Sequence, residues 1–150
     1  RIVAQDVSED RLNLIRENCA RLGVTCVEAA LPSTLNAQPS ARFDRILVDA
    51  PCSNTGVMRR RVDLRWRIQL DEIERLRATQ LDLLRQAATR LKSGGVLVYS
   101  TCSLEPEENS GVVKQFLANH AGFQLESERQ LLPFTDGVDG AYVARLKLSN

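Results

Sequence analysis

The sequence predicts an α/β protein built around a mostly parallel sheet, and three observations lead to this class. Short apolar runs alternate along the chain with segments of helical periodicity, the pattern of strand–helix–strand units. Two of these runs, within residues 43–49 and 96–100, contain uninterrupted Ile-Leu-Val and Val-Leu-Val, as buried strands do. With 150 residues, of which 43% are hydrophobic and 26% charged, the chain suits one globular domain.

Each element is predicted from its apolar spacing and from the residues that bound it. The first helix begins after Ser8, a residue type that caps helices, and ends at Gly23. Strands are expected over residues 1–6, 24–28, 43–49 and 96–100, after Gly122, and over residues 142–148. Helices are expected over residues 8–22, about 70–92 and about 106–120, with loops over residues 29–42, 50–67 and 136–140.

Glycine and proline set the boundaries in the second half of the chain. The long helix is predicted to end at Ser93-Gly94-Gly95. Pro106 fits the first turn of the last helix, and Glu107 and Glu108 follow where the helix dipole favours acids. The chain begins with Arg1 inside an apolar run, so we interpret it as a piece of a longer protein.

Composition and cysteine spacing exclude several classes of protein. No run of about 18 apolar residues is present, so no membrane span is expected. No secretory signal is visible, so the four cysteines are expected to be reduced thiols in a cytoplasmic protein. None of them forms a C-x-x-C pair, so no metal site is indicated.

Two cysteines follow the ends of buried-type strands. Cys52 comes three residues after Asp49, and Cys102 follows the strand over residues 96–100. Ligands of open α/β sheets lie outside the carboxyl ends of the strands, so both thiols are expected near one crevice. Either cysteine alone is more simply a small buried residue. The pair, flanked by small polar residues, favours a catalytic role over a structural one.

Two thiols and a carboxylate suit modification at carbon 5 of a cytosine or uracil. A thiolate that adds to carbon 6 makes carbon 5 nucleophilic, which splits one hard step into two easier ones. A carboxyl group such as that of Asp49 can stabilise the ring, and a second thiol can assist release of the first. A Cys–His hydrolase is disfavoured, because the only histidine, His120, lies far along the chain from either cysteine.

Two further features could bind a nucleotide. Asp6 ends the first strand, where a carboxylate can accept ribose hydroxyls of an adenosine cofactor or simply serve a loop. The loop over residues 59–67 holds five arginines and one aspartate within a chain of net charge +1. A basic loop with one aromatic side chain suits an RNA backbone and base, or is a solvated loop with Trp66 in the core. The candidate RNA-binding residues are Arg59, Arg60, Arg61, Arg65 and Trp66.

The sequence resembles the RNA 5-methylcytosine methyltransferases of the Nol1/Nop2/Sun family. Asp49-Ala50-Pro51-Cys52-Ser53-Asn54-Thr55-Gly56 is similar to one signature motif of that family. Ser100-Thr101-Cys102-Ser103-Leu104-Glu105-Pro106-Glu107-Glu108-Asn109 is similar to the other, 50 residues later. Val57-Met58-Arg59-Arg60 and Asp63-Leu64-Arg65-Trp66 look most like the bacterial Sun/Fmu branch, whose members act on small-subunit ribosomal RNA.

The resemblance implies a Rossmann-like sheet that uses S-adenosylmethionine to methylate a cytosine in RNA, with ribosomal RNA as the expected partner. It implies that Cys102 is the nucleophile, that Cys52 aids product release and that Asp49 contacts the base. Asp6 would hold the cofactor ribose, and Asp49 and Pro51 would lie against the cofactor. No oligomeric state is implied.

The chain departs from the family pattern in two places. The family's first strand and glycine-rich loop precede the segment like residues 1–6, so residues 1–150 are expected to form a single partial catalytic domain, incomplete alone. The family's acid near the adenine is represented only by Glu28, one strand position early. An RNA-binding module without activity is therefore the alternative. A methyltransferase for exocyclic amines is disfavoured, because that chemistry needs no thiol.

Overall fold

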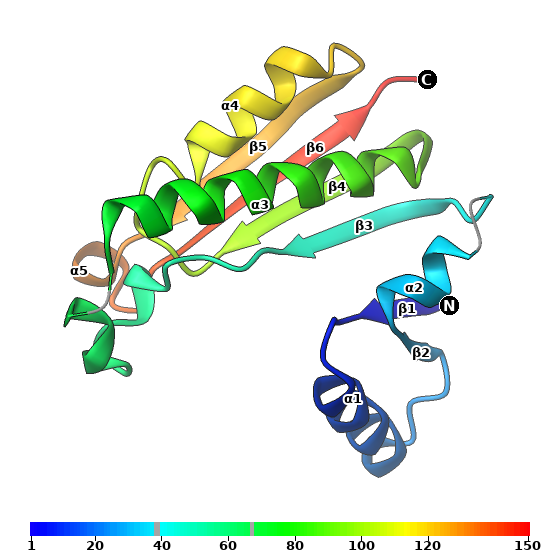
Figure 1. The fold of residues 1–150 in the computed structure, drawn as a ribbon. Coiled ribbons are helices and arrows are strands. Elements are labelled where there is room, and N and C mark those ends of the chain that lie inside the picture. The colour runs from blue at the N-terminus through cyan, green and yellow to red at the C-terminus, as the bar shows by residue number, and fades with distance from the viewer. Residues whose placement is uncertain (38–39, 67) are drawn as a thin grey trace. The chain divides into compact units, whose positions relative to one another are not determined.

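The computed structural model describes residues 1–37, 40–66 and 68–150. Residues 38–39 of the predicted loop 29–42, and Arg67 of the basic loop, lie outside the described residues. The chain forms two compact units, Arg1–Ala41 and Arg42–Asn150, which we call unit 1 and unit 2 (Figure 1). Within the described ranges, no helix is both long and apolar enough to cross a bilayer.

Unit 1 is a strand–helix–strand unit followed by a short helix. Its elements are β1 (Ile2–Gln5), α1 (Glu9–Leu22), β2 (Val27–Ala30) and α2 (Pro32–Asn36). The two strands pair in parallel, as a helical crossover requires. The helix buries Leu12 completely, and left-handed Gly23 ends it as predicted.

Two predictions for unit 1 need correction. The Ser8 side chain makes no capping hydrogen bond; its backbone N–H instead donates to Asp6 Oδ1 at 2.9 Å, which forms an Asx turn before α1. The second strand begins at Val27 rather than at residue 24, because the Val24 N–H bonds the Cys19 carbonyl at 2.8 Å and closes the helix end.

Unit 2 is a four-stranded mixed sheet in the order β3-β4-β6-β5. Its elements are β3 (Phe43–Asp49), η1 (Thr55–Val57), η2 (Val62–Trp66), α3 (Leu70–Thr89), β4 (Leu91–Thr101), α4 (Ser110–Asn119), β5 (Phe123–Leu131), α5 (Pro133–Asp136) and β6 (Ala141–Leu148). β3 and β4 are parallel, whereas β6 is antiparallel to both of its neighbours. The connection from β5 to β6 is too short for the crossover that parallel strands need, so this half of the sheet is antiparallel.

Helices α3 and α4 cover one face of this sheet (Figure 1). Side chains alternate along β6, where Tyr142, Ala144 and Leu146 are buried and the residues between them are exposed. The largest fully buried side chains of the core include Leu84, Leu97, Tyr99, Phe116 and Leu146. The alternate side chains of each strand therefore lie on the opposite face of the sheet. The predicted α/β class is confirmed.

Two boundaries of unit 2 differ from prediction. Helix α3 ends at Thr89, and Ser93-Gly94-Gly95 lies inside β4. Gly94 has a φ of +69°, and the pairing skips from Phe43↔Leu91 to Arg45↔Val96, so the glycines form an irregularity in the strand.

Helix α4 begins at Ser110, not at Pro106. The segment before it forms turns, in which the Asn109 N–H bonds the Pro106 carbonyl at 3.2 Å. Glu108 and Asn109, at the end of these turns, have fully buried side chains that bond the loop of Cys102.

Candidate active site

The two predicted cysteines meet at one edge of unit 2. Asp49 and Ser100 pair at the carboxyl ends of the adjacent parallel strands β3 and β4. Both chains then leave the sheet at the same edge, and the Cys52 and Cys102 sulfur atoms lie 3.3 Å apart. Both are free thiols.

The two thiols differ in exposure and in acidity. The Cys52 side chain is buried, whereas Cys102 is half-buried. The hydrogen bond from Cys52 lowers the pKa of Cys102 from 9.0 to about 7, against the opposing effects of burial and of the Asp49 and Glu108 carboxylates. The same bond, together with burial, raises the pKa of Cys52. The thiol–thiol bond is the largest cause of the lowered Cys102 pKa, and helix α4 begins only at Ser110, eight residues after this cysteine.

Asn54 joins the two cysteine loops and was missed by the sequence analysis. Its backbone is left-handed, with a φ of 60°, a conformation that Asn tolerates better than most residues. Its side-chain amide donates to the Cys52 carbonyl at 2.7 Å and accepts from the Cys102 thiol at 2.9 Å. The signal that could have found it is its place in a run of small polar residues after Cys52.

A buried polar cluster lies beneath the cysteines. Ser53 and Ser103, the residues that follow the two cysteines, both donate through their hydroxyls to the Glu108 carboxylate. Gln80 on α3 donates to Glu108 at 3.0 Å and to the Pro51 carbonyl at 2.9 Å. Glu108 was expected only at a helix start, and the sequence does not single out Gln80 or the serines.

Two glycines bring a third loop against the cysteine loops. The Gly56 N–H donates to the Cys102 carbonyl at 3.0 Å, and the Gly140 N–H donates to the Gly56 carbonyl at 2.8 Å. A Cβ on Gly56 would lie 2.3 Å from the Gly140 oxygen and 2.8 Å from the Cys102 oxygen. Only glycine allows this approach of three backbone segments.

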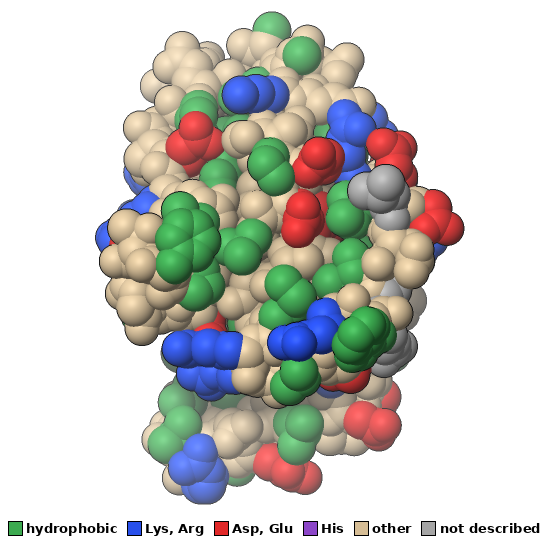
Figure 2. All heavy atoms as spheres, turned by 90° about the vertical axis from the view of Figure 1, so that its left-hand side faces the viewer, with side chains coloured by type: hydrophobic (Ala, Val, Ile, Leu, Met, Phe, Trp, Pro, Cys, Tyr) green, Lys and Arg blue, Asp and Glu red, His purple; other side chains and the backbone are tan. Residues whose placement is uncertain are grey.

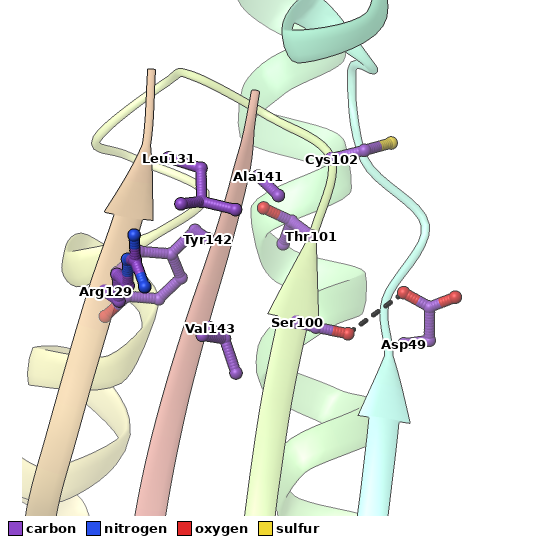
Figure 3. A pocket seen from close by; sticks show the side chains of 9 residues that line it. All are labelled: Asp49, Ser100, Thr101, Cys102, Arg129, Leu131, Ala141, Tyr142 and Val143. Atoms are coloured by element: carbon purple, nitrogen blue, oxygen red, sulfur yellow. Dashed lines mark hydrogen bonds between the residues drawn. The ribbon is translucent and has the colours of Figure 1, made fainter. Parts of the chain in front are cut away.

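A hollow of about 350 Å³ opens beside Cys102 (Figure 3). Asp49, Ser100, Val143 and Arg129 are successive cross-strand partners, so they form one row across the sheet. Asp49 Oδ1 accepts from the Ser100 hydroxyl at 3.0 Å, and Arg129 lies at the far end of the row. Neighbouring strands are roughly 4.8 Å apart, so the row spans roughly 14 Å.

The basic loop is exposed on the same unit. Trp66 is 81% exposed, which contradicts the alternative that it packs in the core. Arg59 and Arg60 both form ion pairs with Asp139, whereas Arg61 and Arg65 have no ion-pair partner among the residues that the structure describes. Figure 2 shows Lys and Arg side chains beside exposed hydrophobic ones on the side where η1 and η2 lie.

The predicted cofactor residues are divided between the two units. In unit 1, Asp6 follows β1 and accepts from the Ser8 N–H, with Arg11 at 3.4 Å from its other oxygen. Glu28 on β2 forms an exposed ion pair with Arg1. Asp49 and Pro51 belong to unit 2, where Pro51 is exposed beside Cys52.

His120 is half-buried and packs against core aromatic residues rather than joining this site. Its ring stacks on Phe116 with centroids 4.1 Å apart, and its Nδ1 contacts the Phe116 carbonyl at 2.8 Å. Its other aromatic neighbour is Phe123. The structure thus gives no Cys–His pair within the described residues.

Comparison with known proteins agrees with this geometry. Residues 1–147 match the family model described as 16S rRNA methyltransferase RsmB/F. The chain belongs to this family. Among curated relatives, ribosomal RNA small subunit methyltransferase B of Pasteurella multocida is 41% identical over 97% of the chain, and that of Vibrio cholerae is also 41% identical over 97%. The chain spans about a third of their length, 36% and 35% respectively.

Solved structures confirm the Rossmann-like methyltransferase fold. The crystal structure of NSun6 from Pyrococcus horikoshii with SFG is similar over 100% of the chain and 42% of its own, with a TM-score of 0.88 and 32% identity. A methyltransferase from Pyrococcus furiosus has a TM-score of 0.67 at 13% identity, over 100% of this chain and 64% of its own, which shows the fold alone.

Proposed function

We propose that this chain carries the reacting thiols of an S-adenosylmethionine-dependent RNA methyltransferase that acts on carbon 5 of a cytosine, in ribosomal RNA. The family membership supports RNA methylation, and the thiol pair supports the position on the base. The observation that carries the proposal is the 3.3 Å contact between a buried thiol and a half-buried one whose pKa is lowered to about 7. Reduced thiols of this kind suit a cytoplasmic enzyme.

Cys102 is the nucleophile in this proposal, because it is the more exposed and the more acidic thiol. The target base leaves its stack and enters the hollow beside Cys102. The thiolate bonds to carbon 6, and the ring electrons move to carbon 5, which would take the methyl group as its bond to the sulfonium sulfur of the cofactor breaks and leaves a neutral thioether. A base then removes the proton from carbon 5, the double bond re-forms and the Cys102 thiolate leaves.

Asp49 and Cys52 act around this adduct. Asp49 lies at the end of β3 on the hollow and can bond the polar edge of the base, which stabilises charge on the ring. Cys52, whose pKa is raised, stays a protonated thiol at neutral pH and can donate to the departing Cys102 sulfur. The row from Asp49 to Arg129 is long enough for the target base to lie at Asp49 and a phosphate of the RNA backbone at Arg129.

The cofactor supplies a sulfonium methyl group. Asp6 suits its ribose, since a half-buried carboxylate at a strand end accepts hydroxyl donors, and the Arg11 contact of 3.4 Å leaves room for them. Asp49 and Pro51 are the further residues proposed to contact the cofactor. Glu28 would have to exchange its ion pair with Arg1 to meet the adenosine.

RNA would be held by the exposed basic loop. Arg61, Arg65 and Trp66 are the principal candidates, since Asp139 already neutralises part of the charge of Arg59 and Arg60. An RNA-binding chain without activity would use the same residues. Methyl transfer to RNA distinguishes the two functions.

Cysteine variants of the full-length protein test the proposal. Cys102→Ala is expected to abolish transfer of labelled methyl groups to RNA, because no thiolate can reach carbon 6. Cys52→Ala is expected to accumulate a protein–RNA adduct that survives denaturation. Cys26→Ala, an exposed cysteine of unit 1, is the matched control and should behave as the parent. Methylation that persists without Cys102 contradicts the mechanism.

A further inference from the structure

Glu108 is a fully buried acid whose partners come from both cysteine loops. Its carboxylate accepts the Ser53 N–H at 3.0 Å and the Ser53 hydroxyl, on the loop of Cys52. It accepts the Ser103 hydroxyl at 2.6 Å, on the loop of Cys102. Gln80 completes the set from α3.

This arrangement is unusual because buried acids are commonly paired with a cation. Among residues 1–37, 40–66 and 68–150, Glu108 has no Lys, Arg or His partner. Hydrogen bonds alone satisfy the carboxylate, and three of the donor groups belong to the residues directly after the cysteines. Glu108 therefore ties together two segments that are 50 residues apart in sequence.

The carboxylate also sets the direction of the surrounding hydrogen bonds. Ser103 gives its only proton to Glu108, so the Thr55 hydroxyl, 3.3 Å from the Ser103 hydroxyl, must donate to it. The lone pairs of Thr55 and Ser103 then accept the Leu104 and Glu105 N–H groups, at 2.8 and 3.0 Å. A group that only accepts is needed at the centre of this network.

We propose that Glu108 is a positioning residue that fixes the two cysteine loops to each other and so holds the Cys52 and Cys102 sulfur atoms within hydrogen-bonding distance. It touches neither sulfur and acts through Ser53 and Ser103. Its importance for catalysis rests on the proposed function, but its effect on the thiols does not.

Four titratable or charged groups face Cys102 from the elements around it. Cys52 donates a hydrogen bond from the loop after β3, Asp49 and Glu108 contribute negative charge, and Arg129 lines the same hollow from β5. Removal of the Glu108 charge alone would lower the pKa of Cys102, because that charge opposes the thiolate. Loss of loop positioning would raise it, because the Cys52 hydrogen bond would lengthen. A purely electrostatic role and a positioning role of Glu108 therefore predict shifts of the Cys102 pKa in opposite directions when Glu108 is replaced.

The test is the pH dependence of Cys102 alkylation by iodoacetamide in the full-length protein. Cleavage at Lys92 and Lys114 yields a peptide in which Cys102 is the only cysteine, so its labelling can be followed by mass spectrometry. The parent is expected to show a midpoint near pH 7, and Glu108→Gln a midpoint shifted toward 9.0. A glutamine amide nitrogen in place of Oε1 meets the N–H donors of Ser53 and Gln80, and in place of Oε2 it forces the Ser53 and Ser103 hydroxyls to reverse and accept.

Glu107→Gln is the matched control, since Glu107 is the exposed neighbour and its midpoint should not move. Ser53→Ala and Ser103→Ala keep the charge and remove one bond each, so smaller upward shifts are expected. If Glu108→Gln loses its far-ultraviolet circular dichroism and is therefore unfolded, the midpoints of Ser53→Ala and Ser103→Ala test the proposal instead. An unchanged or lowered midpoint in the folded variants overturns the proposal, whereas loss of methylation with unchanged midpoints bears on the proposed function alone.

Discussion

Two chemically identical side chains acquire different acidities in this site because one donates a hydrogen bond to the other. Cys52 is buried and donates, so its pKa rises, while the acceptor Cys102 has its pKa lowered. The carboxylates nearby work against this effect but do not cancel it. Acidity here depends on sulfur–sulfur geometry rather than on a cationic neighbour.

This difference predicts a pH dependence of stability. The Cys102 pKa is about 7 in the folded chain and 9.0 for a free thiol, so its contribution is fully present above 9 and is lost as the pH falls through 7. The raised pKa of Cys52 lowers the free energy of unfolding only above pH 9, where the thiol ionises in the unfolded chain but not in the folded one. We expect the free energy of unfolding by urea to rise from pH 7 to pH 9 relative to Cys102→Ser. Parallel profiles for parent and variant would contradict the lowered pKa.

The sequence could predict the candidate reacting residues but not the contacts that hold them. Asp49, Cys52 and Cys102 are recognisable because each follows an apolar run, and strand ends are readable from one segment of chain. Glu108 bonds Ser53 across 55 residues and Gln80 across 28 residues, and the local sequence does not mark these distant contacts. Asn54 needs a left-handed backbone that only the folded loop reveals.

The loops at the edge of unit 2 pack together, and Gly56 and Gly140 bring two of them into backbone contact. Gly56→Ala is expected to destabilise the chain by about 1–3 kcal/mol, because the new methyl group overlaps backbone that cannot move away cheaply. Gly122→Ala is the control, since its Cβ would lie 3.4 Å from Leu148 in ordinary contact. Equal midpoints in urea unfolding for the two variants would show that the loops are not tightly packed.

The basic loop should divide functionally according to its ion pairs. Arg61→Gln and Arg65→Gln are each expected to weaken RNA binding and to reduce the slope of log K against log salt by about 0.7–0.9 for each phosphate that the variant no longer neutralises. Arg59→Gln should have a smaller effect, because Asp139 already binds that side chain. Arg85→Gln on α3 serves as control. Filter binding over a salt series measures these slopes, and equal effects of all four variants would rule out this division.

Element boundaries were predictable where a residue acts locally and wrong where tertiary contacts decide. Gly23 ends α1 as expected, since a left-handed residue stops a helix in any context. Ser93-Gly94-Gly95 was assigned to a helix end, but the strand pairing of β4 extends past it to Leu91. Pro106 permits a helix start, yet burial of Glu108 and Asn109 delays the helix to Ser110.

At the scale of the whole molecule, the α/β class was readable from the alternation of apolar runs, but the sheet order was not. The chain divides into two units, and the large buried cluster found among the described residues lies in unit 2. In the sheet, β6 lies between β4 and β5. The local sequence of a strand does not indicate which strands will be its neighbours, so this order could not be predicted. A single partial catalytic domain stays a prediction.

The core of unit 2 predicts a contrast between two identical substitutions. Phe116 is 1% exposed and packs against His120 and Phe123, whereas Phe134 is 83% exposed. Phe116→Ala is expected to cost about 3–5 kcal/mol of unfolding free energy, and Phe134→Ala less than about 0.5 kcal/mol. Thermal or urea unfolding measures both. A large loss for Phe134→Ala would mean that this side chain is covered in solution.

The pairing of β3 with β4 makes β4 intolerant of insertions after Val96. From Arg45↔Val96 to Asp49↔Ser100 the register is unbroken, whereas the glycine irregularity lies before Val96. An extra residue before Val96 can be absorbed there. One inserted after it would turn every following side chain to the opposite face, so that Ser100 would point toward the helices and Cys102 would part from Cys52.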